Sequence, residues 1–202
     1  MRPAVVVLAG GTSRRWGSRD KTAALLAGRT VLEHAVTGLV AGAGVGLEDV
    51  VVVAPPSHPA RAALPGARWV REEPPGGGPV AGLAAAVAVL DPALELVVVA
   101  AGDAPFAGVA VPSLLDAVVR PDAVGLDGTI AVDTDGRDQP LLAVYRVAAL
   151  RQALPAGSGG RLRDVVAALH LARVPVEARA ALDLDTPADL AIAERLLPPL
   201  PP

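Results

Sequence analysis

Short apolar runs alternate along the chain with longer segments rich in Ala and Leu. The short runs consist mainly of Val and predict β-strands, which we place at 5–9, 49–54, 67–70, 94–101, 123–126, 129–136, 140–146 and 171–176. The longer segments predict helices at 31–40, 78–90, 112–120, 147–154, 161–169 and 185–197. Several strands are apolar on both faces, and helices lie between them. The pattern therefore predicts an α/β fold with a mainly parallel sheet covered by helices on both faces.

Polar residues and prolines mark where several of these helices begin. Thr30 precedes the first helix and Glu33 follows three residues later, which is the spacing of a capping box. Pro79 lies in the first turn of a later helix, where its missing N–H costs nothing. Thr186 followed by Pro187 predicts the same kind of start for the last helix.

The length of 202 residues, without a long linker, predicts one domain, a Rossmann-like three-layer sandwich over residues 1–197, and a Pro-rich tail at 198–202. The formal net charge is −3 and aromatic residues make up 2 %, so we do not expect the protein to bind nucleic acid. It contains no cysteine, which excludes disulfides, thiolate metal sites and cysteine nucleophiles. Neither a secretory signal nor an apolar stretch long enough for a membrane span is evident, so we expect a cytoplasmic protein without membrane contact.

The first apolar strand ends in a loop, LAGGTSRRWGSRDK at 8–21, that combines glycines with basic side chains. In an open parallel sheet, ligands bind outside the carboxyl ends of strands, so this loop has the place of a binding site. Gly10 and Gly11 would let backbone N–H groups approach a ligand closely. Arg15 and Lys21 would add hydrogen-bond donors and positive charge, which suit a polyphosphate. The loop matches neither the P-loop pattern nor G-x-G-x-x-G, and a basic turn that only faces solvent is the alternative.

Carboxylates follow later apolar runs of the chain. Asp103 comes directly after the run at 94–101 and is either a helix cap or a metal ligand. Beside a polyphosphate, Mg²⁺ is a reasonable ligand for it, because Mg²⁺ takes one or two carboxylates together with phosphate oxygens. Asp183 and Asp185 would face the same side of a strand, although Asp185 is also placed to cap the last helix. The histidines show no metal-binding spacing and are interpreted as structural or surface groups.

The loop at 8–21 is similar to the signature of sugar-nucleotide-type nucleotidyltransferases, L-A-G-G-x-x-x-R-M-G-x-x-x-K. The chain resembles more closely the molybdenum cofactor guanylyltransferases. Their motifs have counterparts here in the same order: REEPPGGGPVAGL (71–83), AAGDAPF (100–106), DGRDQPLLAVYR (135–146), GSGGRLRDVV (157–166) and DLDTPADL (183–190). The first motif specifies only the superfamily, whereas the ordered set is considerably more specific.

The resemblance implies a nucleotidyltransferase domain that uses GTP and Mg²⁺ to transfer GMP to molybdopterin and releases pyrophosphate. It implies nucleotide contacts from Leu8, Ala9, Gly10, Gly11, Lys21, Glu72, Gly82 and Asp103. It implies catalytic roles for Arg15, Lys21 and Asp103, with Asp103 as the Mg²⁺ ligand, and substrate binding by Arg161, Asp183 and Asp185. We expect a monomer that acts on small molecules and passes its product to molybdoenzymes or their chaperones.

Several positions depart from the family pattern: Trp16, Glu72, Gln139, Asp183 and Asp185 stand where the family usually has Met, Asp, His, Asn and Asn. The last two changes leave open a related cytidylyltransferase, or a nucleotidyltransferase with another phosphorylated small-molecule acceptor. A non-catalytic nucleotide-binding module is a further alternative, but it would be expected to lack Lys21 or Asp103. A dinucleotide-dependent oxidoreductase would be expected to carry G-x-G-x-x-G.

Overall fold

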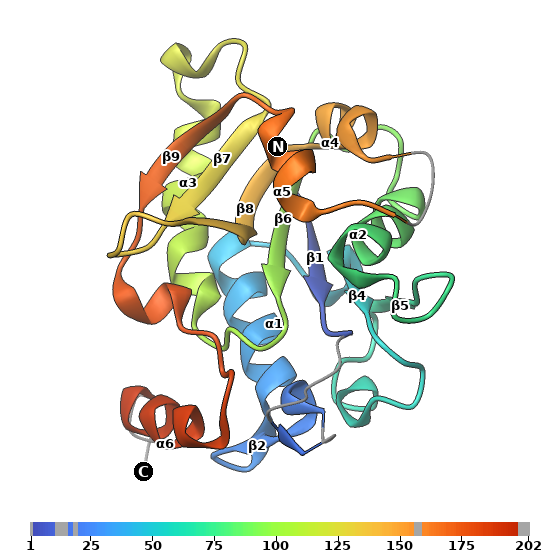
Figure 1. The fold of residues 1–202 in the computed structure, drawn as a ribbon, viewed down its shortest axis with the longest axis vertical. Coiled ribbons are helices and arrows are strands. Elements are labelled where there is room, and N and C mark those ends of the chain that lie inside the picture. Colours follow the sequence, from blue (N-terminus) through green and yellow to red (C-terminus); the bar gives the residue numbers. More distant parts are fainter. Residues whose placement is uncertain (1, 11–15, 18–19, 156–158, 198–202) are drawn as a thin grey trace.

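The computed structural model describes residues 2–10, 16–17, 20–155 and 159–197 (Figure 1). Its central element is a seven-stranded sheet in the order β5-β4-β1-β6-β8-β7-β9. The strands are β1 (Ala4–Leu8), β4 (Val50–Val53), β5 (Arg68–Val70), β6 (Leu96–Ala101), β7 (Gly128–Val132), β8 (Asp138–Arg146) and β9 (Leu171–Pro175). β8 is antiparallel to both of its neighbours, and the other adjacent pairs are parallel. This confirms the predicted α/β fold with a mainly parallel sheet.

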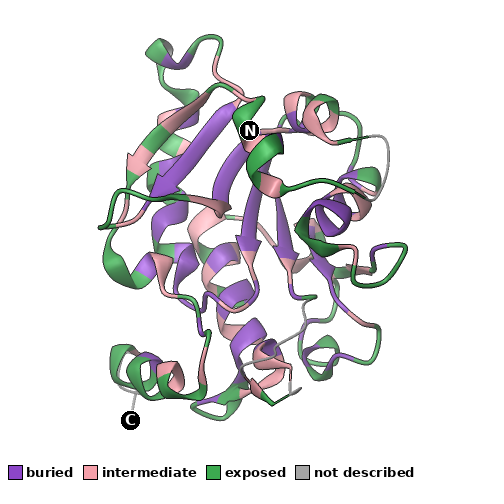
Figure 2. Ribbon diagram, in the orientation of Figure 1, coloured by how far each residue is buried: buried purple, intermediate pink, exposed green. Residues whose placement is uncertain are grey.

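Helices cover both faces of the sheet, and β1, β4, β6 and β7 between them are buried almost throughout (Figures 1 and 2). One face carries α1 (Val31–Ala43) and α3 (Val111–Val119), and the other carries α2 (Gly78–Ala88), α4 (Val147–Ala153) and α5 (Leu162–Ala167). Successive residues of a strand point to opposite faces, so Val5 and Val7 join the first core and Val6 joins the second. Outside these layers, α6 (Pro187–Leu196) lies next to the small hairpin formed by β2 (Leu25–Leu26) and β3 (Arg29–Thr30).

The predicted helix starts are confirmed. The Thr30 N–H donates to Oε2 of Glu33 over 2.8 Å, and the Glu33 N–H donates to Oγ1 of Thr30 over 3.2 Å, which completes the capping box of α1. A second capping box joins Thr186 and Asp189 at the start of α6, so Asp185 is not the cap of this helix. Within the described parts of the chain, no helix is both long enough and apolar enough to cross a membrane.

One predicted strand is wrong, and a second is wrong in part. Residues 123–126 do not form a strand: the 3₁₀ helix η6 (Pro121–Ala123) is followed by a turn in which Gly125 has a φ of 84°. The strand predicted at 129–136 ends at Val132, because Asp133 begins a turn in which its Oδ1 accepts hydrogen bonds from the backbone N–H groups of Asp135 and Arg137. A short run of apolar residues therefore does not by itself determine a strand where the hydrogen bonds of a local turn compete.

A close approach between α1 and the 3₁₀ helix η5 (Ala107–Ala110) fixes the segment that follows Asp103. A Cβ atom at Gly108 would lie 2.1 Å from the carbonyl carbon of Gly38, and one at Gly42 would lie 2.3 Å from the carbonyl oxygen of Gly108. Both distances are far inside van der Waals contact, so only glycine permits this spacing of the two backbones. The residues after Asp103 are thus held against the helix that begins at the capping box.

We expect Gly108→Ala to lower the free energy of unfolding by about 2–3 kcal/mol, because the added methyl group forces η5 away from α1. Denaturant unfolding of the variant measures this loss. Gly159→Ala is the matched control, since nothing lies within 4 Å of a Cβ at Gly159, and it should change the stability by less than about 0.5 kcal/mol. Equal stability of the two variants would contradict the close approach.

Candidate functional site

The carboxyl ends of β1, β4 and β6 meet at one edge of the sheet, and backbone hydrogen bonds continue past the ends of the strands. The Ala9 N–H donates to the Val53 carbonyl over 2.8 Å, and the Gly102 N–H donates to the Leu8 carbonyl over 2.9 Å. A Cβ atom at Gly102 would lie 2.9 Å from the Cβ of Ala9, so a side chain there would separate the two segments. The loops after β1 and β6 therefore lie side by side, at the edge where ligands bind in such sheets.

Lys21 is the only lysine of the sequence, and its ammonium group lies between two carboxylates. Nζ forms one ion pair with Oδ2 of Asp103 and a second with Oδ1 of Asp185, at 2.8 Å. The side chains of Lys21 and Asp103 are only 22 % and 13 % exposed. Burial by itself would lower the pKa of Lys21, but hydrogen bonds and charges from Asp103 and Asp185 outweigh it, and the pKa is raised. Lys21 is therefore a cation held at a defined place.

Asp183 adds a third carboxyl group to this environment. Its pKa is raised to about 6, first by partial removal from water and then by the negative charges of Asp103 and Asp185, while Lys21 opposes the shift. Because the residue as a whole is exposed, solvent screens part of this shift. We call Asp103, Asp183 and Asp185 the acidic cluster. When all three are ionised they outnumber the one ammonium group, so the cluster has an excess of negative charge.

The segment that carries Asp183 and Asp185 is not a strand, so strand alternation is not the reason why both face the cluster. Instead, Leu184 between them is fully buried in a small apolar core below the site. Its N–H donates to the carbonyl of Asp103 over 3.0 Å, and its carbonyl accepts a hydrogen bond from Nε1 of Trp16 at 3.2 Å. The anchored leucine thus presents the carboxylates on its two sides to Lys21 and Asp103.

Glu72 is a buried carboxylate beside the first loop. The residue is 9 % exposed, and its Oε1 accepts a hydrogen bond from the Gly76 N–H at 3.0 Å. A Cβ atom at Gly10 would lie 3.7 Å from the same oxygen, so the carboxylate faces the Gly10 backbone directly. On α2, a Cβ atom at Gly82 would lie 3.5 Å from Cδ2 of Leu8. These four predicted contact residues border one region at the end of β1, apart from the acidic cluster.

Some of the predicted residues are found neither in the acidic cluster nor in the region at the end of β1. Arg161 is exposed at the start of α5, where the preceding Gly160 faces Val80 in the first turn of α2, so it lies beside α2 and not in the acidic cluster. Gly11 and Arg15 lie outside the described residues, as does the tail at 198–202.

Three polar residues next to the Lys21 segment were not predicted as part of the site. Asp20, Thr22 and His58 are joined by hydrogen bonds. Thr22 follows Lys21 directly, but His58 lies 36 residues further along the chain than Thr22. No spacing rule connects two positions so far apart. His58 was interpreted as a structural or surface group, and its burial shows that it is structural.

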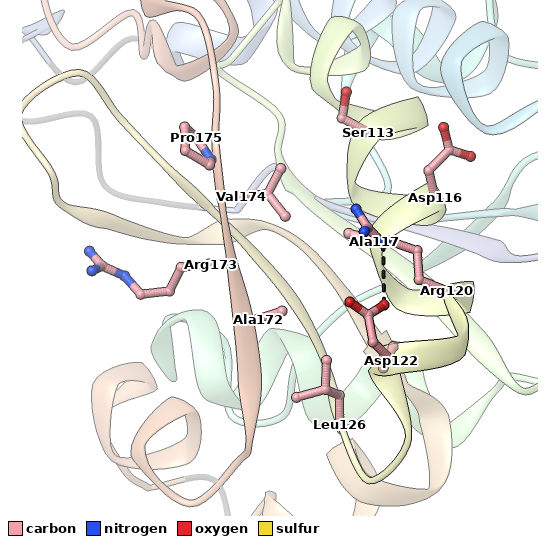
Figure 3. A pocket seen from close by; sticks show the side chains of 11 residues that line it. Ser113, Asp116, Ala117, Arg120, Asp122, Leu126, Ala172, Arg173, Val174 and Pro175 are labelled. Carbon is pink, nitrogen blue, oxygen red and sulfur yellow. Dashed lines mark hydrogen bonds and ion pairs between the residues drawn. The ribbon is translucent and has the colours of Figure 1, made fainter.

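Two cavities differ in their relation to this site. One of about 840 Å³ lies next to the Lys21 segment and is lined mainly by apolar residues such as Trp16 and Leu25, with Asp20 as its acidic member. The other, of about 620 Å³, lies between α3 and β9 and contains none of the predicted site residues (Figure 3). Its Arg120 forms an ion pair with Asp122, drawn as a dashed line.

The model of the MobA-like NTP transferase domain matches residues 5–174. The chain belongs to this family. A probable molybdenum cofactor guanylyltransferase from Chloroflexus aggregans is 36 % identical, over 95 % of this chain and 93 % of that protein. A molybdenum cofactor guanylyltransferase from Bradyrhizobium sp. is 32 % identical, over 95 % and 91 %. The structure of molybdopterin-guanine dinucleotide biosynthesis protein A from Archaeoglobus fulgidus has the same fold, with a TM-score of 0.68 over 96 % of this chain and 97 % of that one, at 23 % identity.

Family membership confirms the resemblance inferred from the ordered motifs. The part matched by the MobA-like domain contains Lys21, Glu72 and Asp103, whereas Asp183 and Asp185 lie beyond it. The structure nevertheless joins the two parts, because Lys21 and Asp103 both contact the segment from 183 to 185. The C-terminal segment therefore belongs to the same site as the MobA-like motifs.

We expect Asp183→Asn to make the stability of the MobA-like chain less sensitive to pH. The native carboxyl group keeps its proton up to about pH 6, whereas in the unfolded chain it loses the proton near its ordinary pKa of about 4. The native state therefore binds more protons between these values, and wild-type stability falls as the pH rises through this window. The variant has no carboxyl group at this position, so its stability does not fall in this way. Its free energy of unfolding relative to the wild type should therefore rise by about 1 kcal/mol from pH 4 to pH 7, a figure already reduced because solvent screens the exposed residue.

Urea unfolding at several pH values in a chelating buffer measures this difference. Asp122→Asn, at an exposed position remote from the cluster, is the control and should show no such change. A difference between Asp183→Asn and the wild type that stays constant with pH would contradict the raised pKa.

Proposed function

We propose that this chain transfers GMP from GTP to the molybdenum cofactor (molybdopterin), forming molybdopterin guanine dinucleotide and pyrophosphate. The observation that carries the proposal is the Lys21 ammonium group between Asp103 and Asp185, at the carboxyl edge of a parallel sheet in a MobA-like chain. The names of the relatives from Chloroflexus aggregans and Bradyrhizobium sp. support the choice of donor and acceptor.

This reaction requires no protein nucleophile. The terminal phosphate of the pterin substrate attacks the α-phosphorus of GTP, a new P–O bond forms, and the bond from the α-phosphorus to the departing pyrophosphate breaks. A phosphate monoester is already largely anionic near neutral pH, because its second pKa is about 6. The protein must bring two anions together and stabilise the leaving group. Lys21 supplies a positioned cation for the triphosphate, and Arg15 is proposed as a second one.

Asp103 is proposed to bind Mg²⁺, and its surroundings fit that ion. Asp103 and Asp185 contact the same ammonium group, so their carboxylate oxygens lie close together, and Mg²⁺ prefers one or two carboxylates with phosphate oxygens. No three His, Cys, Asp or Glu side chains of the described residues are grouped closely enough to hold a metal, so phosphate oxygens and water would supply the further ligands. The bound ion would neutralise charge on the departing pyrophosphate.

Glu72 is proposed to recognise the guanine base. An ionised carboxylate only accepts hydrogen bonds, and guanine presents two adjacent donors, its N1–H and its 2-amino group. Adenine and cytosine each present one amino group beside a ring-nitrogen acceptor, so either base could make only one of the two contacts. The buried Glu72 beside Gly10 therefore favours GTP over both ATP and CTP. A cytidylyltransferase is the second candidate function, because the departures from the family pattern at Asp183 and Asp185 leave it open.

The acceptor is proposed to contact Asp183 and Asp185 in the acidic cluster and Arg161, which lies apart from them beside α2. A pterin ring carries amino and ring N–H donors that carboxylates accept. Another phosphorylated small molecule with similar donors is the alternative acceptor. We further propose that the protein is a cytoplasmic monomer that delivers its product to molybdoenzymes or their chaperones.

Calorimetric titration with GTP, CTP and ATP, each with and without Mg²⁺, is expected to show tightest binding for Mg²⁺–GTP. Glu72→Gln should weaken GTP binding by about 1–3 kcal/mol, because the amide turns a donor toward guanine. Glu73→Gln is the matched control, since the neighbouring Glu73 is exposed, and it should bind GTP as the wild type does. Preference for CTP would support the cytidylyltransferase, and binding of no nucleotide would contradict both functions.

Turnover of GTP with molybdopterin is expected to depend on Lys21 and Asp103. Lys21→Ala should lower kcat/KM by roughly 30- to 5000-fold, which corresponds to about 2–5 kcal/mol for the loss of a desolvated charge contact. Asp103→Asn should abolish Mg²⁺-dependent turnover while the protein remains folded. Arg137→Ala removes an exposed ion pair with Asp135 in the β7–β8 turn and should leave turnover unchanged. Unchanged activity of Asp103→Asn would contradict the metal assignment.

A further inference from the structure

A chain of hydrogen bonds joins Thr22, the residue after Lys21, to Asp20 and His58. Oγ1 of Thr22 is 2.7 Å from Oδ1 of Asp20 and 3.0 Å from Nε2 of His58. Asp20 also accepts a hydrogen bond from the Thr22 N–H at 2.9 Å and so caps the 3₁₀ helix η2 (Lys21–Ala23). Thr22 and His58 are 5 % and 4 % exposed, whereas Lys21 next to them reaches the site. The three groups form a polar anchor, by which we mean Asp20, Thr22 and His58 together.

The directions of these hydrogen bonds are consistent with one another. Nδ1 of His58 accepts a hydrogen bond from the Ala60 N–H at 3.2 Å, so the proton of the neutral ring lies on Nε2. Burial lowers the pKa of His58 despite the nearby negative charges of Asp20 and Glu33, which favours the neutral ring. Nε2–H then donates to the Thr22 hydroxyl, and this hydroxyl donates to the Asp20 carboxylate. Each polar group of the anchor therefore has a partner of the correct kind.

His58 connects this anchor to the central sheet. It follows β4 and begins the 3₁₀ helix η4 (Pro59–Arg61), and its ring lies 5.9 Å from the ring of Trp69 on β5, measured between centroids. The histidine therefore connects the segment after β4 to a side chain of the neighbouring strand β5. The hydrogen bond between Thr22 and His58 ties η2 to this part of the fold.

We propose that Thr22 and His58 are positioning residues, which hold the Lys21 backbone so that its ammonium group meets the triphosphate. This inference rests on the proposed function, in which Lys21 binds the nucleotide. A lysine side chain loses about 2 kcal/mol of rotamer entropy when it is fixed, so its attachment point matters. The acidic cluster cannot hold Lys21 alone, because metal and phosphate groups would compete for the same charges. The hydrogen bond between Thr22 of η2 and His58 is buried and involves no member of the acidic cluster.

Thr22→Val tests the proposal, because it removes the hydroxyl group with little change of shape. We expect kcat/KM for GTP to fall about tenfold or more, since small displacements of a positioned group cost up to about a hundredfold. Thr22→Ser keeps the hydroxyl and should remain within about threefold of the wild type. His58→Leu should resemble Thr22→Val, and His58→Gln, which can present an amide N–H near the place of Nε2, should recover part of the loss.

Thr129→Val separates positioning from stability. Thr129 is equally buried, and its Oγ1 donates to the Leu114 carbonyl over 2.9 Å, far from the site on β7. Thr129→Val should therefore lower the Tm by an amount similar to that of Thr22→Val and leave kcat and KM unchanged. If Thr22→Val also lowers only the Tm and leaves kcat and KM unchanged, Thr22 is merely structural and the proposal is overturned.

A second readout does not depend on catalysis. Because Lys21 is the only lysine, selective nitrogen-15 labelling of lysine reports on its amide and ammonium groups alone in the NMR spectrum. Thr22→Val should shift or broaden both signals, Thr22→Ser should restore them, and Thr129→Val should leave them unchanged. If the wild type uses no nucleotide yet the spectra change in this way, the proposed function fails and the positioning of Lys21 stands. Unchanged spectra in Thr22→Val would overturn the positioning even where turnover is present.

Discussion

One ammonium group joins three distant segments of this chain at the carboxyl edge of its sheet. Lys21 comes from the loop after β1, Asp103 from the loop after β6, and Asp185 from the segment before α6. An exposed ion pair contributes only about 0–1 kcal/mol, but Lys21 and Asp103 are largely withdrawn from water. Removal of this cation would leave Asp103 and Asp185 without the ammonium group that they share. The arrangement of the three segments therefore depends on the charge of Lys21.

The remaining structure brings these segments to the same place and keeps them there. The sheet is buried on both faces, so its strands cannot shift without exposing Val side chains such as Val5 and Val6. Close backbone contacts at Gly102 and Gly108 then fix the loop that carries Asp103 against β1 and α1. The Asp103 carboxylate, although it lies on a loop, is thereby held as firmly as the surrounding strands and helices.

Charge balance connects this architecture to the chemistry. Asp103, Asp183 and Asp185 lie close to the ammonium group of Lys21, and partial removal from water together with the charges of the other two carboxylates raises the pKa of Asp183. Under the proposed function, a divalent cation would coordinate carboxylates of this cluster and phosphates of the nucleotide. The proposed metal binding and the proposed acceptor binding would then both depend on the charge of the acidic cluster.

The sequence by itself determined the layers of the fold and the loops in which chemistry was expected. Apolar runs and capping residues such as Thr30 and Glu33 act over a few neighbouring positions, so the main strands, the helix starts and the segments after β1 and β6 were predicted. The strand predicted at 123–126 does not form, because these apolar residues take part in a turn at Gly125.

Only the tertiary structure decided which of these residues meet. Lys21 and Asp185 are 164 residues apart, and Thr22 and His58 are 36 apart. No periodic pattern relates such positions. Their contact results from the order of the strands and from the packing of loops at one edge of the sheet. Local sequence thus specified the candidate groups, and long-range packing specified their distances, because the energy of each contact depends on burial that only the complete fold creates.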